Sequence, residues 1–112
     1  MSERLNPLPQ DDGLAAPGGE PQARVAFVVH GHVQGVGYRA FARHAARALE
    51  LSGFVRNEWD RTVCGQAAGS KSALEALRVA LDRGPVFGRV SRLDWSPHSE
   101  GESLPFPFEI RP

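Results

Sequence analysis

Three glycines separate an apolar, alternating segment from a segment with helical periodicity, in the stretch HGHVQGVGYR at residues 30–39. The preceding RVAFVVH, residues 24–30, alternates large apolar side chains as a strand does. Its second face also carries apolar residues, which is typical of a strand in the middle of a sheet. Because glycine adopts left-handed conformations at little steric cost, the junction predicts a tight turn between a strand and a helix.

Two later segments have helical periodicity. The first, YRAFARHAARALEL, shows one apolar stripe made of Tyr38, Phe41, Ala45, Ala48 and Leu49. Gly53 is expected to end this helix as its left-handed cap. The second, ALEALRVALDR, is expected to open at a capping box of Ser72 and Glu75 and to stop at Gly84.

Four further segments have the pattern of strands, at residues 54–59, 62–69, 89–95 and 106–110. Pro107 favours an edge position for the last and shortest of them. The predicted order is βαββαβ plus a short fifth strand, and right-handed crossovers would place both helices on one face. The sequence therefore predicts an α+β fold, the ferredoxin-like split β-α-β sandwich, with an antiparallel sheet.

The first part of the chain, residues 1–23, has a different composition from the rest. It holds four of the nine prolines and only small or scattered apolar residues, so it can neither form a ladder nor bury much surface. We expect a disordered N-terminal leader at 1–23 and one domain at 24–112. From Arg24 on, twelve basic residues stand against nine acidic ones. That balance is too weak for a nucleic-acid surface but suits a small anionic ligand.

Several function classes are disfavoured by what the sequence lacks. Cys64 is the one cysteine, so no intrachain disulfide can form. No apolar run approaches the length of a membrane span, and the N-terminus lacks the apolar stretch of a secretory signal. We expect a cytoplasmic protein with no membrane or nucleic-acid partner, and its small size favours a monomer.

The glycine junction has the features of an anion site. Successive loop N–H groups can converge on one point, and the helix after them adds its unpaired N–H groups and positive dipole end. Arg39 stands in the first helical turn, where a cation is unfavourable by about 0.3–1 kcal/mol unless an anion is bound. Most glycine-containing loops merely turn a corner, so the spacing alone leaves both interpretations open.

A second polar residue, Asn57, lies within a run that otherwise has the pattern of a strand. Asparagine is disfavoured in strands. Its amide both donates and accepts, so it could hold a water molecule by two bonds. An exposed strand asparagine without any such role is an equal alternative on local grounds.

The two stretches together resemble a known family. VHGHVQGVGYR at 29–39 and GFVRN at 53–57 are similar to the signatures of acylphosphatases. The resemblance continues over roughly 24–112, through VCGQAAG, the GP after the second helix and the terminal FEIR. It implies the same small ferredoxin-like fold. It also implies hydrolysis of acyl phosphates to a carboxylate and inorganic phosphate, by attack of water on phosphorus, with neither a metal nor an organic cofactor.

The resemblance also implies the roles of individual residues. The phosphate-binding loop would comprise His32, Val33, Gln34, Gly35, Val36, Gly37 and Tyr38. Arg39 would bind the phosphate and Asn57 would position the attacking water. The partners implied are an acyl phosphate substrate and inorganic phosphate as product or inhibitor. Because an acyl phosphate is an activated mixed anhydride, positioning and charge stabilisation can carry the reaction.

Some residues depart from the family pattern or need a separate interpretation. Arg61 follows Asp60 where many relatives have glycine; a left-handed arginine would cost about 1 kcal/mol, so another turn type is expected. Glu58, beside Asn57, should point to the opposite face of the sheet. Cys64 is interpreted as a packing or surface residue. The histidines near the motif are interpreted as structural or surface residues: His30, His32 and His44.

Two other function classes compete with the enzyme. One is a non-catalytic anion-binding or regulatory domain of the same fold, as occurs as one module of larger hydrogenase-maturation proteins. The presence of both Arg39 and Asn57 favours catalysis. The other is RNA binding, which the low charge and the lack of paired strand aromatics disfavour.

The composition of the leader leads to a first prediction. Deleting residues 1–22 should leave the melting temperature and the activity almost unchanged, because the leader is expected to bury little apolar surface. Thermal unfolding and the hydrolysis assay described below check this. A large drop in either would show that the leader docks on the domain.

Overall fold

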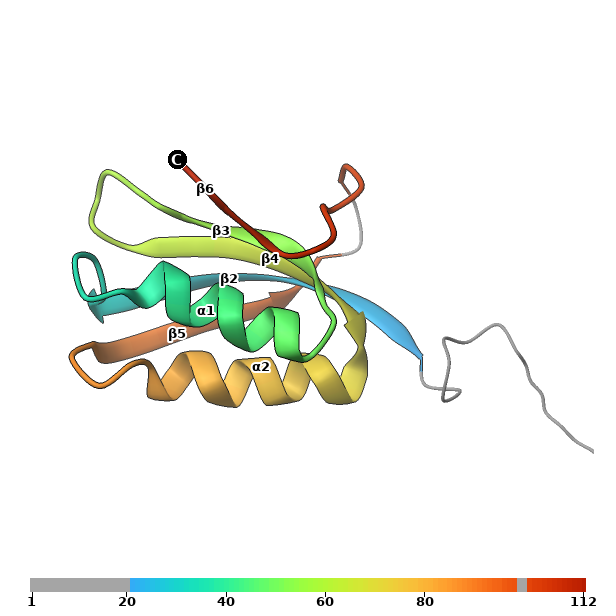
Figure 1. Cartoon of the computed structure of the whole chain (residues 1–112), viewed down its shortest axis with the longest axis horizontal. Helices are drawn as coiled ribbons and strands as arrows, with labels where there is room; N and C mark the ends of the chain where they lie inside the picture. Colours follow the sequence, from blue (N-terminus) through green and yellow to red (C-terminus); the bar gives the residue numbers. More distant parts are fainter. Residues whose placement is uncertain (1–20, 99–100) are drawn as a thin grey trace, which may run out of the picture.

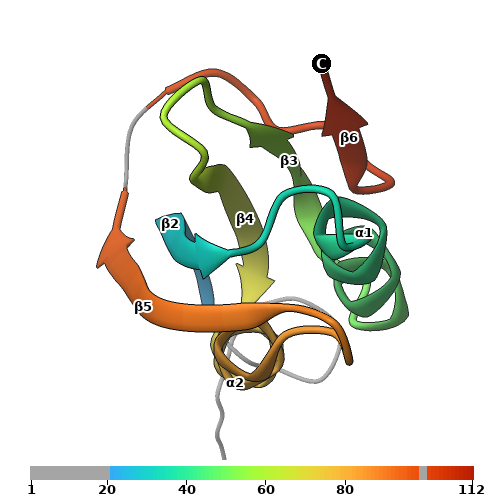
Figure 2. The ribbon, with the colours of Figure 1, turned by 90° about the vertical axis from the view of Figure 1, so that its left-hand side faces the viewer.

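The computed structural model describes residues 21–98 and 101–112. Its elements are β2 (Gln22–His32), α1 (Tyr38–Ala48), β3 (Ser52–Asn57), β4 (Val63–Ser70), α2 (Lys71–Arg83), β5 (Arg89–Pro97) and β6 (Glu109–Arg111). The five strands form one sheet in the order β5-β2-β4-β3-β6. Both helices cover the same face of this sheet (Figures 1 and 2). The predicted ferredoxin-like split β-α-β sandwich is confirmed.

The last strand differs from the prediction in its direction. β2, β3, β4 and β5 pair antiparallel, as expected. β6 lies at the edge, as Pro107 suggested, but it runs parallel to β3. The sheet is therefore mixed. The segment before β6 lies at the start of β3, where Gly53 N donates to Pro105 O at 2.8 Å, and β6 then runs along β3 in the same direction (Figure 1).

The start of the fold lies slightly earlier than predicted. Residues 1–20, most of the expected leader, lie outside the described residues. β2 begins at Gln22, which pairs with Ser70 of β4, and the carbonyl of Pro21 accepts a bond from Lys71 N at 3.2 Å. The deletion of residues 1–22 predicted above would remove both contacts, so the leader alone is tested by deleting residues 1–20. In the described part of the chain, no helix combines the length and apolar character needed to cross a membrane.

Strand β2 occupies the central place that its two apolar faces predicted. It lies between β5 and β4, and Val25, Phe27 and Val29 are buried beneath the helices. The three inward leucines of α2 meet them from the other side: Leu74, Leu77 and Leu81. Helix and strand periodicity thus agree on a single core between the two layers.

Helix α1 differs from the prediction in its buried stripe and its end. The buried residues are Tyr38, as predicted, and Ala42 and Ala46, which were not predicted. Ala45 and Leu49 are partly buried against the core, as expected, whereas Phe41 and Ala48 are not part of it. The helix ends in a Schellman motif, with Leu51 N bonded to Ala46 O at 3.0 Å. Glu50 takes the left-handed position of that motif at φ 58°. The expected glycine cap was wrong, because Gly53 belongs to β3.

The N-cap of helix α2 lies two residues before the one that was predicted. The Ser70 hydroxyl accepts a bond from Ala73 N at 3.2 Å, so Ser70 is the N-cap and Ser72 is not. Glu75 pairs with Arg78 and does not reach back to the cap. The other end was predicted correctly, since Gly84 follows the last helical residue at φ 73°.

The β3–β4 hairpin differs from the prediction, because its turn does contain a left-handed arginine. Arg61 has φ 76°, and its N–H donates to Glu58 O at 3.1 Å. A second bond, from Glu58 N to Thr62 O at 2.8 Å, closes the hairpin. This is the pattern of a three-residue hairpin loop with a left-handed last residue. Asp60 stabilises it by accepting bonds from the Thr62 N–H and hydroxyl at 3.0 and 2.6 Å.

The strain at Arg61 leads to a prediction about stability. Replacing Arg61 by glycine removes the steric cost of a side chain in the left-handed conformation, but it also increases the entropy of the unfolded chain. The net effect should be a gain of about 0.5–1 kcal/mol in the free energy of unfolding. The midpoint of urea unfolding should rise accordingly. Arg78→Gly, at an ordinary helical position, is the matched control and should lower stability by about 1 kcal/mol or more. A lower midpoint for Arg61→Gly would contradict this account of the turn.

Candidate active site

The loop after β2 and the hairpin after β3 lie at the same end of the molecule (Figure 1). Both strands pair antiparallel with β4, which lies between them, so they run in the same direction. The register aligns Val29, Val63 and Asn57 in one row across the three strands. The fold therefore brings Asn57 beside the glycine loop, although the two are some twenty residues apart in sequence.

Two of the three glycines shape the loop. Gly35 and Gly37 are left-handed at φ 77° and 79°, whereas Gln34 and Val36 are not at positive φ. This alternation of ordinary and left-handed residues turns successive N–H groups toward one concave side, as in an anion-binding nest. Gly31, in contrast, lies within β2, where the register against β5 shifts.

A hollow of about 210 Å³ opens where the loop, α1, β3 and β6 meet. It is lined by Val33, Gly35, Gly37, Tyr38, Arg39, Ala40, Asn57 and Ile110. The structure thus brings together both residues predicted to be catalytic and four of the seven predicted loop residues. His32, Gln34 and Val36 do not line the hollow. Sequence reasoning missed Ala40 and Ile110, whose apolar side chains carry no chemical signal.

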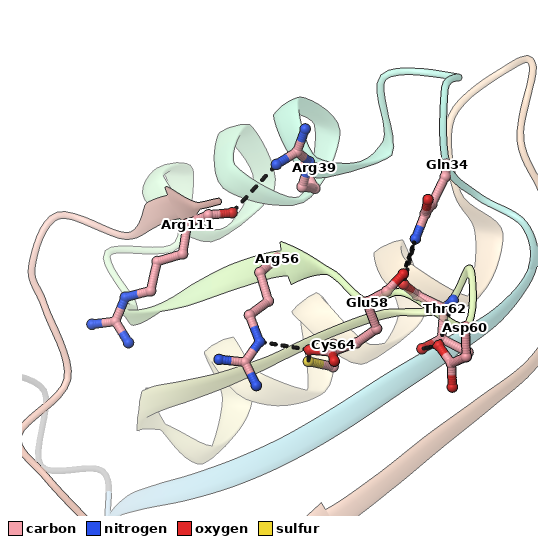
Figure 3. A network of polar contacts seen from close by, with 8 residues as sticks. All are labelled: Gln34, Arg39, Arg56, Glu58, Asp60, Thr62, Cys64 and Arg111. Carbon is pink, nitrogen blue, oxygen red and sulfur yellow. Dashed lines mark hydrogen bonds and ion pairs between the residues drawn. The ribbon is translucent and has the colours of Figure 1, made fainter.

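Arg39 is half-buried in the first turn of α1. One of its terminal nitrogens donates to the carbonyl of Arg111 in β6 at 3.3 Å (Figure 3). Within the described residues it makes no ion pair, so most of its donors are available. The start of α1 carries no acidic residue and no side-chain cap, since Gly37 is the N-cap. An uncapped helix start and an unpaired guanidinium therefore share one hollow.

Asn57 lies on the helix-facing side of the sheet, at the last position of β3. It pairs with the fully buried Val63 and is itself partly exposed to the hollow. Its amide has no hydrogen-bond partner among residues 21–98 and 101–112. A free amide beside a nest of N–H groups can hold a water molecule near a bound anion.

Two loop residues, Tyr38 and Gln34, anchor the loop through side-chain hydrogen bonds to other elements. Tyr38 is buried, and its hydroxyl donates to Leu81 O of α2 at 2.6 Å. Burial, with a further contribution from Asp82, raises the pKa of Tyr38 far above its usual value. Gln34 donates from its amide nitrogen to Glu58 O and Thr62 O at 2.8 and 2.9 Å (Figure 3).

Glu58 points to the open face of the sheet, as the alternation of side chains along the strand predicted, and its carboxylate is hydrogen-bonded there. Its carboxylate accepts bonds from Arg56 Nε at 2.6 Å and from the Cys64 thiol at 2.9 Å (Figure 3). These two bonds, that of Cys64 first, lower the pKa of Glu58. Burial, and then the neighbouring Glu58, raise the pKa of Cys64 to about 11. This cluster neither lines the hollow nor supplies a nucleophile at neutral pH.

The histidines near the motif do not line the hollow. His30 bonds Asp94 at 2.9 Å on β5, while His32 and His44 are exposed. The described part of the chain contains no group of three or more His, Cys, Asp or Glu side chains placed to hold a metal ion. The donors in the hollow are backbone N–H groups, a guanidinium and an amide, a set that fits an anion.

The family can now be assigned from sequence as well as geometry. The family model for acylphosphatases matches residues 25–110, which cover the whole described fold except its ends. The chain belongs to the acylphosphatase family. A curated acylphosphatase from Cupriavidus necator is 47% identical over 82 residues, which is 73% of this chain and 88% of that protein. The family predicted from the two motifs is confirmed.

Solved structures agree with the assignment. The crystal structure of acylphosphatase from Bacillus subtilis matches with a TM-score of 0.74 and 31% identity, over 79% of this chain and 97% of that one. The structure of T. kodakarensis HypF matches with a TM-score of 0.70 and 26% identity, over 81% of this chain but only 12% of that chain. The same fold therefore also occurs as a small part of a much larger protein.

The cluster around Cys64 leads to a prediction about the thiol. Because its pKa is raised to about 11, the fraction of thiolate at pH 7 to 8 should be small and should grow as the pH rises toward 11. The rate of alkylation by iodoacetamide should follow the same rise. Cys64→Ala should retain hydrolysis, since the thiol lies outside the hollow. Fast alkylation at pH 7, or loss of hydrolysis in this variant, would refute the interpretation.

Proposed function

We propose that this protein is an acylphosphatase whose active site is the hollow between the glycine loop, Arg39 and Asn57. The observation that carries the proposal is that three features meet in one small site: an arginine and an amide that have no side-chain partner within the described residues, and an uncapped helix start. Membership of the family supports the reaction, which is hydrolysis of a mixed anhydride between a carboxylic acid and phosphoric acid.

The phosphoryl group would sit on the concave side of the loop. N–H groups of the loop from His32 to Tyr38, and of the first turn of α1, would donate to its oxygens, while the Arg39 guanidinium would make charge-assisted bonds to them. These donors are fixed before substrate arrives. Preorganised donors stabilise charge as it moves in the transition state more effectively than water, which must reorient.

The Asn57 amide would hold the attacking water in line with the bond that breaks. The water oxygen forms a bond to phosphorus, and the bond between phosphorus and the acyl oxygen breaks. Its electron pair leaves with the carboxylate. No imidazole, carboxylate or thiol lines the hollow in the described structure. The water proton would therefore pass to a phosphoryl oxygen of the substrate itself.

We further propose that the protein acts as a cytoplasmic monomer on small acyl phosphates, with inorganic phosphate as product and inhibitor. A single, unpaired cysteine is compatible with a reducing compartment. The near-neutral charge of the chain gives no support to nucleic acid as a partner.

The proposal predicts hydrolysis of benzoyl phosphate in the presence of a chelator. Arg39→Ala should remove most phosphate affinity and nearly all turnover, because it deletes the main cation of the site. Asn57→Ala should nearly abolish turnover while phosphate still binds, because it removes only the water ligand. Release of phosphate under steady-state conditions, together with inhibition by added orthophosphate, measures both effects.

Matched control variants separate these effects from general damage. Arg43→Ala removes a cation one turn further along α1, outside the hollow, and Gln66→Ala removes an amide from the open face of the sheet. Both should hydrolyse benzoyl phosphate like the unmodified protein. Phosphate binding without any hydrolysis by the unmodified protein would instead support the anion-binding domain. Full activity of both Arg39→Ala and Asn57→Ala would exclude the proposed site.

A further inference from the structure

We infer that Gln34 is a positioning residue, which sets the place of Asn57 relative to the phosphoryl group by tying the loop to the β3–β4 hairpin. Gln34 was predicted as a member of the phosphate-binding loop, yet its side chain does not line the hollow. This inference rests on the proposed roles of Arg39 and Asn57, and it assigns Gln34 a task other than contact with phosphate.

The contact uses both N–H groups of the Gln34 amide. The amide nitrogen of Gln34 has two N–H groups, and it donates to Glu58 O at 2.8 Å and to Thr62 O at 2.9 Å. Both acceptors are backbone carbonyls on the two sides of the hairpin base (Figure 3). The side chain is half-buried, so these bonds are partly shielded from water. One side chain thus bridges segments 24 and 28 residues away in sequence.

The position of Asn57 depends on this contact because the β3–β4 ladder ends there. Asn57 pairs with Val63, and the next residue, Glu58, already belongs to the hairpin base. Beyond the ladder, the closing bond from Glu58 N to Thr62 O holds the two sides together. Gln34 bonds the carbonyls of these same two residues. It therefore fixes the hairpin base against the loop that would carry the phosphate.

The loop also needs an anchor on its own side. Left-handed glycines at positions 35 and 37 give the turn its shape but add no side-chain contact. Tyr38 anchors the far end of the loop to α2, and Gln34 anchors the near end to the hairpin. Within the described residues, the side-chain hydrogen bonds that link the loop to the hairpin all come from Gln34.

The expected kinetic signature separates positioning from binding. Loss of Gln34 removes no donor from the hollow, so the affinity for phosphate should persist. The attacking water, held by Asn57, should lose its alignment with phosphorus. A misplacement of about 1 Å can cost up to about 100-fold in rate. The loss should therefore fall on kcat, in contrast to Arg39→Ala, where phosphate affinity falls as well.

The test compares Gln34→Met with Gln66→Met in the full chain, using benzoyl phosphate as substrate and orthophosphate as inhibitor. Methionine keeps the length of the side chain and removes both donors. Gln66 is the matched control, since its amide accepts a bond from Arg24 on the open face of the sheet. We expect kcat of Gln34→Met to fall by about 10- to 100-fold with an almost unchanged phosphate inhibition constant. Gln66→Met should retain kcat.

A double-mutant cycle shows whether Gln34 acts through Asn57. In an Asn57→Ala background, Gln34→Met should lower the residual rate by less than about twofold, because the aligned water is already lost. A full multiplicative loss, an unchanged kcat in the single variant, or a parallel loss of phosphate affinity would each overturn the inference. If Gln34→Met does not fold, Gln34→Asn is measured by the same criteria, since it keeps the amide but shortens its reach. Absence of hydrolysis by the unmodified protein would instead count against the proposed function.

Discussion

The antiparallel pairing of β4 with both β2 and β3 is the constraint on which the rest of the molecule depends. It makes the outer two strands of this trio run in the same direction, so the glycine loop and Asn57 emerge at one end. Because side chains alternate along a strand, a slip of one residue would turn Asn57 to the open face. The buried Val63, which pairs with both Val29 and Asn57, opposes such a slip. Gly65 holds the trio close, since a Cβ there would lie 2.2 Å from Phe54 O.

The two helices share one fold but begin in different ways, and the difference marks the site. α2 is capped by its own Ser70 and follows the ordinary rules of helix stability. α1 begins at a left-handed glycine without a side-chain cap, and Arg39 follows in its first turn where a cation is unfavourable. Local preferences therefore agree with the fold at the start of α2 and disagree with it at the start of α1. Such a disagreement is typical of a position kept for a ligand.

Much of the fold could be predicted because apolar periodicity fixes which face of each element is buried. The central place of β2 followed from its two apolar faces, and Arg39 and Asn57 followed from motifs. The predictions that were wrong concerned positions for which several nearby residues are suitable. Ser70 and Ser72 are both capable caps, and only the end of β4 decides between them. Glu50 and Arg61 adopt left-handed backbone conformations, although glycine is the residue that adopts this conformation most easily.

Contacts made to backbone carbonyls could not be predicted in the same way. The bond from Arg39 to Arg111 O and the bonds from Gln34 to the hairpin use acceptors that every residue has. The sequence therefore gives no signal for which carbonyl will be reached. Only the register of β3, β4 and β6 brings these acceptors within range. The residues that touch a ligand are more visible in a sequence than the residues that hold them in place.

The chemistry of the hollow also restricts the class of phosphate compound that the proposed active site would cleave. The one phenol there, Tyr38, is committed to Leu81 O, and burial raises its pKa, so it is a poor proton donor. The remaining lining side chains are apolar apart from Arg39 and Asn57. A phosphate monoester must expel a strongly basic alkoxide, which calls for a general acid. A carboxylate leaves without one. A site that offers positioning and positive charge but no acid therefore selects acyl phosphates over esters by the stability of the group that departs.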